Sequence, residues 1–198
     1  IRHLLDLDAD PVAIDSTFAG GGLRRLSRAH PGLRSPGQVD GFETAVRAVI
    51  GQQISVAGAR TVAGRLAASF GDLMPSGDVL FPSAEAIAEA DPAMLPMPAS
   101  RAATLVSVAR AVADGGLVLD RGADRDQVRA ALLAMRGIGV WTADYVLMRA
   151  LGDPDILLDT DLGVRTAAAA ADVDLSTRRP EWAPYRTYAT HLLWRALS

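Results

Sequence analysis

Two glycines separated by one residue, Gly137 and Gly139, interrupt a helical pattern that resumes at once. Apolar residues recur at three- and four-residue spacing over 125–135 and again over 140–150, so we predict two helices joined by a tight hairpin. Both glycines are expected to supply unusual backbone angles and to let a phosphate approach closely. The first N–H groups of the second helix have no partners within that helix, so they can form a binding site for a DNA phosphate. The hairpin therefore predicts DNA binding that does not read base sequence.

A carboxylate follows the hairpin at a suggestive distance. Asp161 lies about two dozen residues after Gly137, in the run 158–165, and the residues after it have helical periodicity. A carboxylate brought to the edge of the hairpin could stabilise positive charge that develops on a deoxyribose. The alternative role of Asp161 is to cap the next helix, with Asp159 as the cap if that helix starts earlier. One carboxylate can fill both roles, and a plain turn is the corresponding alternative for the two glycines.

The residue types that are missing exclude several chemistries. The 198 residues include no cysteine and three histidines, and all 20 basic residues are arginine. Disulfides, a thiol nucleophile, cysteine-bound zinc, an iron–sulfur cluster and a lysine Schiff base are therefore excluded, and we expect no organic cofactor or redox metal. Because the net charge is −3, a DNA-binding face must be local and built partly from backbone amides.

The periodicity predicts an all-α fold, because strand-like alternation is nearly absent. Helices are expected over 41–50, 56–70, 84–90, 100–113, 125–135, 140–150, 163–171 and 185–197. The Asp10-Pro11 pair and the glycines at 20–22 indicate loops. We expect residues 40–135 to form one helical lobe that leads into the hairpin at 133–145. Residues 1–39 are expected to pack with 146–198 as a second lobe, with a cleft between the lobes.

The ends of the chain and its apolar runs bear on its location. No apolar run approaches the roughly 20 residues that span a bilayer, and the first residues lack a signal-peptide pattern. We therefore expect a soluble, monomeric protein in the cytoplasm, associated with the nucleoid through its activity. Because residue 1 is Ile rather than Met, we expect the chain to be part of a longer polypeptide whose upstream domain is absent here.

Aromatic residues provide candidates for a base pocket. Trp141 and Tyr145 are four residues apart, hence on the same side of one predicted helix, and four more aromatics lie near the C-terminus, at positions 182, 185, 188 and 194. Most of these are expected to be core residues. We single out Tyr145 and Trp194 as pocket walls, because ring quadrupoles attract a positively charged alkylated base.

The chain resembles the helix-hairpin-helix DNA glycosylases and, among them, the inducible bacterial 3-methyladenine glycosylases. The similarity runs over segments 2–7, 34–42, 47–56 and 182–189 in addition to the hairpin. The resemblance implies that Asp161 is the catalytic aspartate and that Gln52 lines the pocket with Trp141, Tyr145 and Trp194. It also implies that Gln53 is the wedge that fills the gap left by a flipped base. The phosphate-gripping residues would be Gly137, Ile138, Gly139, Val140, Trp141 and Thr142. A Na⁺ or K⁺ ion would be held by the backbone carbonyls of Leu133, Met135 and Ile138.

The chain departs from this family in four places. The inducible enzymes carry an apolar wedge at the position of Gln53 and a bulkier residue at Gly163, and they have an N-terminal mixed α/β domain that we expect to be missing here. Relatives that also cut the DNA backbone have a lysine where this chain has Trp141. We therefore predict a monofunctional enzyme that flips alkylated purines, 3-methyladenine and 7-methylguanine, out of double-stranded DNA and hydrolyses the N-glycosidic bond. The alternative is a catalytically silent hairpin module that only grips DNA or searches for lesions.

Overall fold

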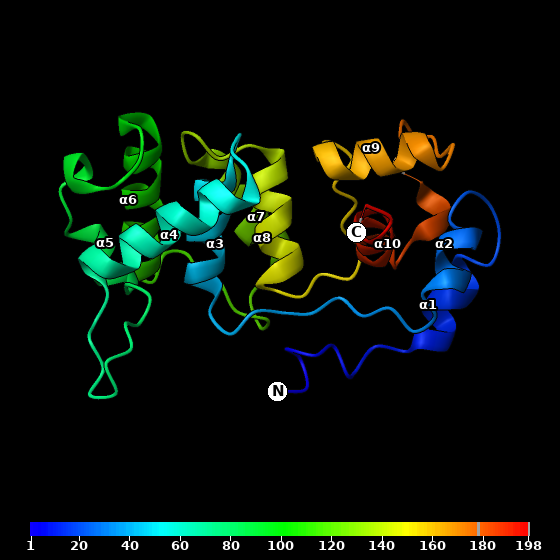
Figure 1. The fold of residues 1–198 in the computed structure, drawn as a ribbon, viewed down its shortest axis with the longest axis horizontal. Coiled ribbons are helices and arrows are strands. Elements are labelled where there is room, and N and C mark those ends of the chain that lie inside the picture. The colour runs from blue at the N-terminus through cyan, green and yellow to red at the C-terminus, as the bar shows by residue number, and fades with distance from the viewer. Residues whose placement is uncertain (178, 198) are drawn as a thin grey trace. The chain divides into compact units, whose positions relative to one another are not determined.

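The computed structural model describes residues 1–177 and 179–197, and within them every regular element is helical (Figure 1). A single isolated antiparallel bridge joins Leu73 to Val79 in the described chain. The helices are α1 (Pro11–Thr17), α2 (Arg24–Ala29), α3 (Gly41–Gly51), α4 (Val56–Phe70), α5 (Ala84–Ala88), α6 (Ala99–Ala113), α7 (Arg125–Ala134), α8 (Val140–Arg149), α9 (Leu162–Ala170) and α10 (Arg186–Arg195), with short 3₁₀ turns η1 (Pro92–Met94) and η2 (Pro180–Trp182). The all-α prediction is confirmed.

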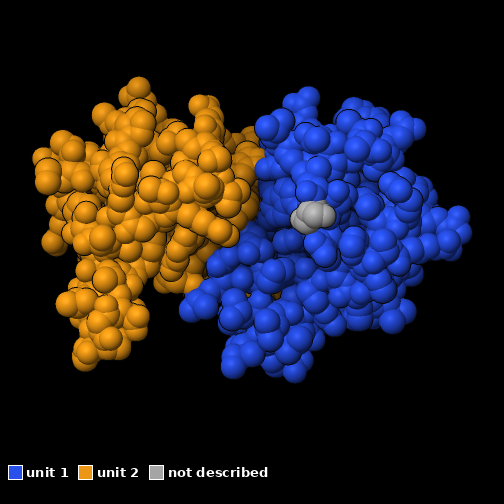
Figure 2. Space-filling model, in the orientation of Figure 1, with its two compact units in different colours: residues 1–39, 147–198 blue, residues 40–146 orange. Residues whose placement is uncertain are grey.

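The chain divides into two compact units (Figure 2). Unit 1 consists of residues 1–39 and 147–198, and unit 2 consists of residues 40–146. The boundary falls inside α8, between Val146 and Leu147. The predicted cleft stays a prediction.

Unit 2 is built around the buried face of α3. This helix packs against α4 and α6, and α5 packs against α6. The helices begin where the sequence offers short polar caps: Asp40, Ser55 and Ser83 each accept a hydrogen bond from a backbone N–H in the first turn of α3, α4 and α5. Such caps satisfy N–H groups that the helix itself leaves unpaired. The core therefore fixes the end of α3, where Gln52 begins the link to α4.

Unit 1 is centred on α10, which packs against α9 and α2. Two side chains of α10 hold the N-terminal segment across a large separation in sequence. The Tyr188 hydroxyl donates to Asp6 at 3.0 Å, and the His191 ring nitrogen Nε2 lies 3.1 Å from the Ser35 hydroxyl. Burial and the nearby Asp6 carboxylate raise the pKa of Tyr188, so it remains a hydrogen-bond donor. Residues 1–39 are thus an integral part of unit 1.

The eight expected helices all occur, each within two residues of its predicted ends. The sequence reading missed α1 and α2, which are seven and six residues long, too short to show a periodic pattern. The prediction of a loop at Asp10-Pro11 is wrong. The Asp10 carboxylate instead caps α1, with Pro11 in the first turn, where its missing N–H is no loss. No helix of the described residues is long and apolar enough to cross a membrane.

Candidate active site

The hairpin between α7 and α8 turns at Gly137. This residue has φ +89°, and the Ile138 N–H donates to the Met135 carbonyl at 3.1 Å to close the turn. A Cβ atom at Gly137 would lie 2.2 Å from the Thr104 hydroxyl, so glycine is required for space as well as for conformation. Ile138, only 7% exposed, anchors the turn in the core of unit 2.

Gly139 has a different role from the one expected. Its φ lies outside the left-handed region, so the prediction of an unusual backbone angle was wrong for this residue. The reason is that Gly139 stands directly before α8, where its carbonyl accepts the Ala143 N–H at 3.0 Å in ordinary helix geometry. A Cβ atom here would have nothing within 4 Å. Gly139 therefore leaves open space in front of the first N–H groups of α8, which is what an approaching phosphate needs.

The Gln52 side chain, at the C-terminal end of α3, holds the hairpin in place. The Gln52 amide donates to the Gly137 carbonyl at 3.1 Å and to the Thr142 hydroxyl at 2.9 Å. The backbone carbonyl of Gln52 in turn accepts from the Arg101 guanidinium at 2.8 Å. Gln52, predicted to line a pocket, thus also braces the hairpin. Because the Thr142 side chain is buried against Gln52, any contact of Thr142 with DNA would come from its backbone N–H.

An ion pair joins the two helices on either side of the hairpin. Arg129 of α7 donates through Nε to Asp144 of α8 at 2.6 Å, and the Asp144 side chain is only 4% exposed. The hydrogen bond with Asp144 raises the pKa of the Arg129 guanidinium. A buried carboxylate with a bidentate arginine partner holds a defined geometry better than an exposed pair. No pattern in the sequence indicates this pair.

The predicted aromatic pair is present as a stack. The rings of Trp141 and Tyr145 lie 5.2 Å apart with 22° between their planes, and both are partly exposed. Val140, just before them, is 43% exposed. Gln53, the predicted wedge, is exposed and has φ +58°, a left-handed conformation that is uncommon outside glycine. Such conformations persist only where the surrounding structure imposes them, and they cluster at functional sites.

Asp161 caps α9 and also receives a second donor. Its Oδ1 atom accepts the Val164 N–H at 2.9 Å and the indole N–H of Trp194 at 2.9 Å. The capping role and a chemical role therefore remain compatible, and the N-terminal end of the helix dipole favours a negative charge here. Gly163 lies close to both side chains. A Cβ atom there would be 3.2 Å from Asp161 Oδ1 and 3.4 Å from the Trp194 ring.

The Trp194 ring is supported in turn by His191. The imidazole meets it edge to face, at 5.3 Å and 89°. Burial, and secondarily the charge of Arg149, lower the pKa of His191 to about 4, so the imidazole is neutral at physiological pH. Sequence reasoning singled out Asp161 and Trp194 separately but missed the bond that joins them. That bond spans 33 residues and has no local signature.

The candidate residues are distributed over both units. Unit 2 carries the hairpin residues with Gln52, Gln53 and Tyr145, and unit 1 carries Asp161 and Trp194. Among the described residues, no group of His, Asp or Glu side chains is suited to hold a metal ion. Of the three carbonyls expected to hold a monovalent cation, that of Met135 already accepts the Ile138 N–H, which leaves a second lone pair for an ion.

Comparison with known proteins identifies relatives along the whole chain. Residues 1–40 match the family model described as the AlkA N-terminal domain, so the segment assigned to the second lobe carries the sequence signature of that domain. A protein of Mycobacterium tuberculosis described as a probable bifunctional transcriptional activator/DNA repair enzyme AlkA is 44% identical over 99% of this chain. This chain spans only 42% of that relative's length.

Two further matches cover most of both partners. DNA-3-methyladenine glycosylase 2 of Escherichia coli is 35% identical, over 98% of this chain and 69% of the relative. The solved structure of the 3-methyladenine DNA glycosylase from Archaeoglobus fulgidus superimposes with a TM-score of 0.79 at 26% identity, over 98% of this chain and 71% of the other. The chain therefore belongs to the DNA-3-methyladenine glycosylase family and has the helix-hairpin-helix glycosylase fold.

Proposed function

We propose that this chain is a DNA glycosylase that removes alkylated purines from double-stranded DNA by hydrolysis. The observation that carries the proposal is the Asp161 carboxylate, held at the start of α9 by the Val164 N–H and by the indole N–H of Trp194. Two donors on one oxygen fix the direction of the carboxylate, and a fixed negative charge stabilises a cationic sugar without reorganisation during the reaction. The family relationship supports this reading.

DNA would be held through its backbone at the hairpin. The first N–H groups of α8 follow Gly139, which has open space where a side chain would be. The positive end of the helix dipole and the outward-facing N–H groups at the start of a helix suit a phosphate at this position. The Gln52 amide and the Arg129–Asp144 pair fix the hairpin, so little conformational entropy is lost on binding. A protein with net charge −3 can hold DNA in this local way.

Selection would begin with the flipped base. An alkylated purine is poorly stacked or paired, so moving it out of the duplex costs less than moving a normal base. We assign Gln53, which is exposed and has φ +58°, to the gap left behind. Purines alkylated at N3 or N7 carry positive charge, which favours contact with aromatic rings such as those of Trp141 and Tyr145. 3-Methyladenine and 7-methylguanine are the substrates that fit this chemistry.

The reaction needs no general acid. The C1′–N bond breaks, its electron pair leaves with the cationic base and neutralises it, and the positive charge moves to the deoxyribose. Asp161 stabilises that charge and accepts the proton of the water that adds to C1′. The product is an abasic site in an intact strand. Because the chain has no lysine, a lysine imine that would lead to strand cleavage cannot form.

A Na⁺ or K⁺ ion at the carbonyls of Leu133, Met135 and Ile138 belongs to the proposal as a structural element. Carbonyl oxygens are suitable ligands for such hard cations. The ion would stiffen the hairpin loop. No chemical step depends on it.

The direct test is base release by this chain from DNA treated with a methylating agent. Chromatography should show free 3-methyladenine and 7-methylguanine, with one alkali-labile site for each base released. Unmethylated DNA is the control. Binding to methylated DNA with no base released above the spontaneous rate would favour the silent hairpin module instead.

A further inference from the structure

The loop that carries Asp161 has no regular secondary structure of its own. It runs from the end of α8 to the start of α9, residues 150–161. A few short turns close within it, such as that from the Asp161 N–H to the Leu158 carbonyl at 3.0 Å. Most of its remaining backbone bonds go to side chains of α10, so the position of the loop depends on that helix.

Two buried threonines of α10 form these bonds. The Thr187 hydroxyl accepts the Ile156 N–H at 3.0 Å and donates to the Asp153 carbonyl at 2.7 Å. The Thr190 hydroxyl accepts the Leu158 N–H at 3.2 Å and donates to the Ile156 carbonyl at 3.1 Å. Each hydroxyl thus satisfies one donor and one acceptor of the loop, because a hydroxyl both donates and accepts. Thr187 and Thr190 are 1% and 0% exposed.

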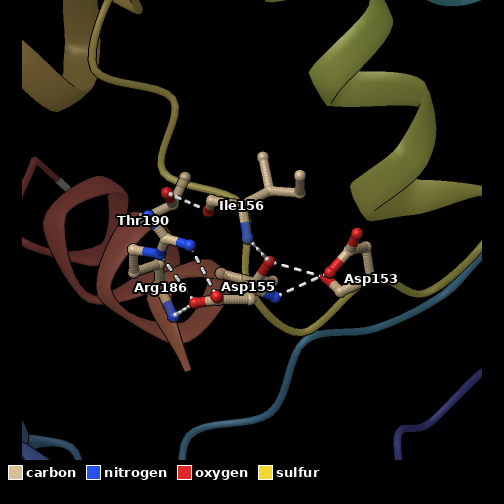
Figure 3. Close-up of polar contacts among 6 residues, drawn as sticks. Asp153, Asp155, Ile156, Arg186 and Thr190 are labelled. Atoms are coloured by element: carbon tan, nitrogen blue, oxygen red, sulfur yellow. Dashed lines mark hydrogen bonds and ion pairs between the residues drawn. The ribbon is translucent and has the colours of Figure 1, made fainter. Parts of the chain in front are cut away.

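An ion pair adds to the contacts between the start of α10 and the loop (Figure 3). Arg186 donates to Asp155 through Nε at 2.7 Å and through a terminal nitrogen at 2.6 Å, and its backbone N–H adds a third bond at 3.2 Å. The hydrogen bond with Asp155 raises the pKa of Arg186, so the guanidinium keeps its charge. Two parallel bonds fix angle as well as distance.

The order of contacts along α10 follows the order of residues in the loop. Arg186 and Thr187 hold 153–156, Thr190 holds 156–158, and Trp194, one turn further on, holds Asp161 itself. Residues three and four apart share one face of a helix, so these side chains form a row. We call Arg186, Thr187, Thr190 and Trp194 the α10 row.

We propose that Thr187 and Thr190 are positioning residues for the reaction, which set where the Asp161 carboxylate stands relative to the deoxyribose. The inference rests on the proposed function of Asp161. A displacement of about 1 Å at a reacting group can lower a rate by about a hundredfold. Loss of one hydroxyl leaves a buried N–H and carbonyl unpaired, and the loop must shift to pair them with water. The shift is transmitted along the loop to Asp161.

The test compares Thr190→Val with Thr190→Ser in the full chain. Single-turnover release of 7-methylguanine from an oligonucleotide duplex is measured at a temperature where circular dichroism shows each variant folded. We expect Thr190→Val to lower the rate at least tenfold and Thr190→Ser to stay within threefold of wild type. Affinity for a duplex with an abasic site should change less than twofold, because Gln52 and the hairpin are untouched.

Measuring Thr190→Val in an Asp161→Asn background separates a positioning role from a general loss of structure. If Thr190 acts through Asp161, Thr190→Val should have less than a twofold effect on the residual rate of an Asp161→Asn variant. Thr44→Val is the matched control, since Thr44 is also buried but its hydroxyl donates to the Asp40 carbonyl at the start of its own helix. That substitution should leave the rate of base release within twofold.

The outcomes distinguish this inference from the proposed function. If Asp161→Asn excises as fast as wild type, the assignment of the carboxylate fails. Suppose instead that Asp161→Asn is slow. The positioning role is then refuted if folded Thr190→Val releases the base within threefold of the wild-type rate, or if Thr190→Val lowers the rate equally in the wild-type and Asp161→Asn backgrounds. Should Thr190→Val not fold, Arg186→Lys, at a side chain 27% exposed, takes its place, with an expected three- to tenfold loss of rate at unchanged affinity.

Discussion

Substitution of Gly137 by alanine tests the account of the hairpin most sharply. At φ +89° an alanine is in a left-handed conformation, which costs about 1–2 kcal/mol. Its Cβ would also stand 2.2 Å from the Thr104 hydroxyl, and overpacking of this kind costs about 1–3 kcal/mol. We expect a loss of roughly 3 kcal/mol in the free energy of unfolding, which corresponds to a fall in Tm of roughly 6–12 °C for a chain of this size.

Thermal unfolding followed by circular dichroism measures this loss, with Gly139→Ala as the matched control. The control should change Tm by less than about 3 °C, since its Cβ meets no atom within 4 Å. In the double variant Gly137→Ala/Thr104→Ala the clash is removed, so the loss should be smaller than the sum of the two single losses. Equal stability of the Gly137 and Gly139 variants, or full additivity in the double variant, would refute the reasoning.

Three further predictions concern DNA binding, pH and the product. Gly139→Asp should abolish DNA binding with helix content unchanged, and Gly139→Asn should weaken binding less, since it adds bulk without charge. Fluorescence anisotropy with a labelled duplex measures both affinities. Unchanged affinity of the Gly139→Asp variant would favour the plain turn. The lowered pKa of His191 means that the unfolded chain takes up a proton as pH falls below about 6.5 while the folded chain does so only near 4. Folding stability should therefore fall by roughly 2 kcal/mol between pH 7.5 and 5 in urea titrations, and by clearly less in His191→Gln; an identical fall in both would contradict this. Borohydride should trap no covalent adduct with DNA, and strands should break only after alkali; scission without alkali at the rate of base release would refute a monofunctional mechanism.

Much of the fold was predictable because its signals are local. Periodicity located the eight longer helices, and the glycine pair located the hairpin. The backbone role of Gly139 was not predictable, because a glycine before a helix can serve either conformation or access, and only the surrounding atoms decide which. Helices α1 and α2 have one or two turns and bury few residues, so they show no period.

The residues to which we assign chemistry have clearer sequence signals than those that hold them in place. Asp161 and Trp194 stand in recognisable local patterns. Their mutual hydrogen bond, the contact of Gln52 with Thr142, and the two threonines of α10 join residues 31 to 90 positions apart. Serine, threonine and glutamine are common in every protein, so their composition gives no hint of such partners. Only the folded chain brings them together.

The central claim is that the charge of Asp161 drives base removal. Asp161→Asn tests it most directly, because asparagine is an equally good helix cap and its side-chain oxygen can still accept from Val164 and Trp194. The variant should fold and bind DNA as the wild type does, and should release 7-methylguanine at least about a hundredfold more slowly in single-turnover assays. Asp159→Asn, two residues away, should have a much smaller effect. Release by Asp161→Asn within tenfold of the wild-type rate would contradict the account.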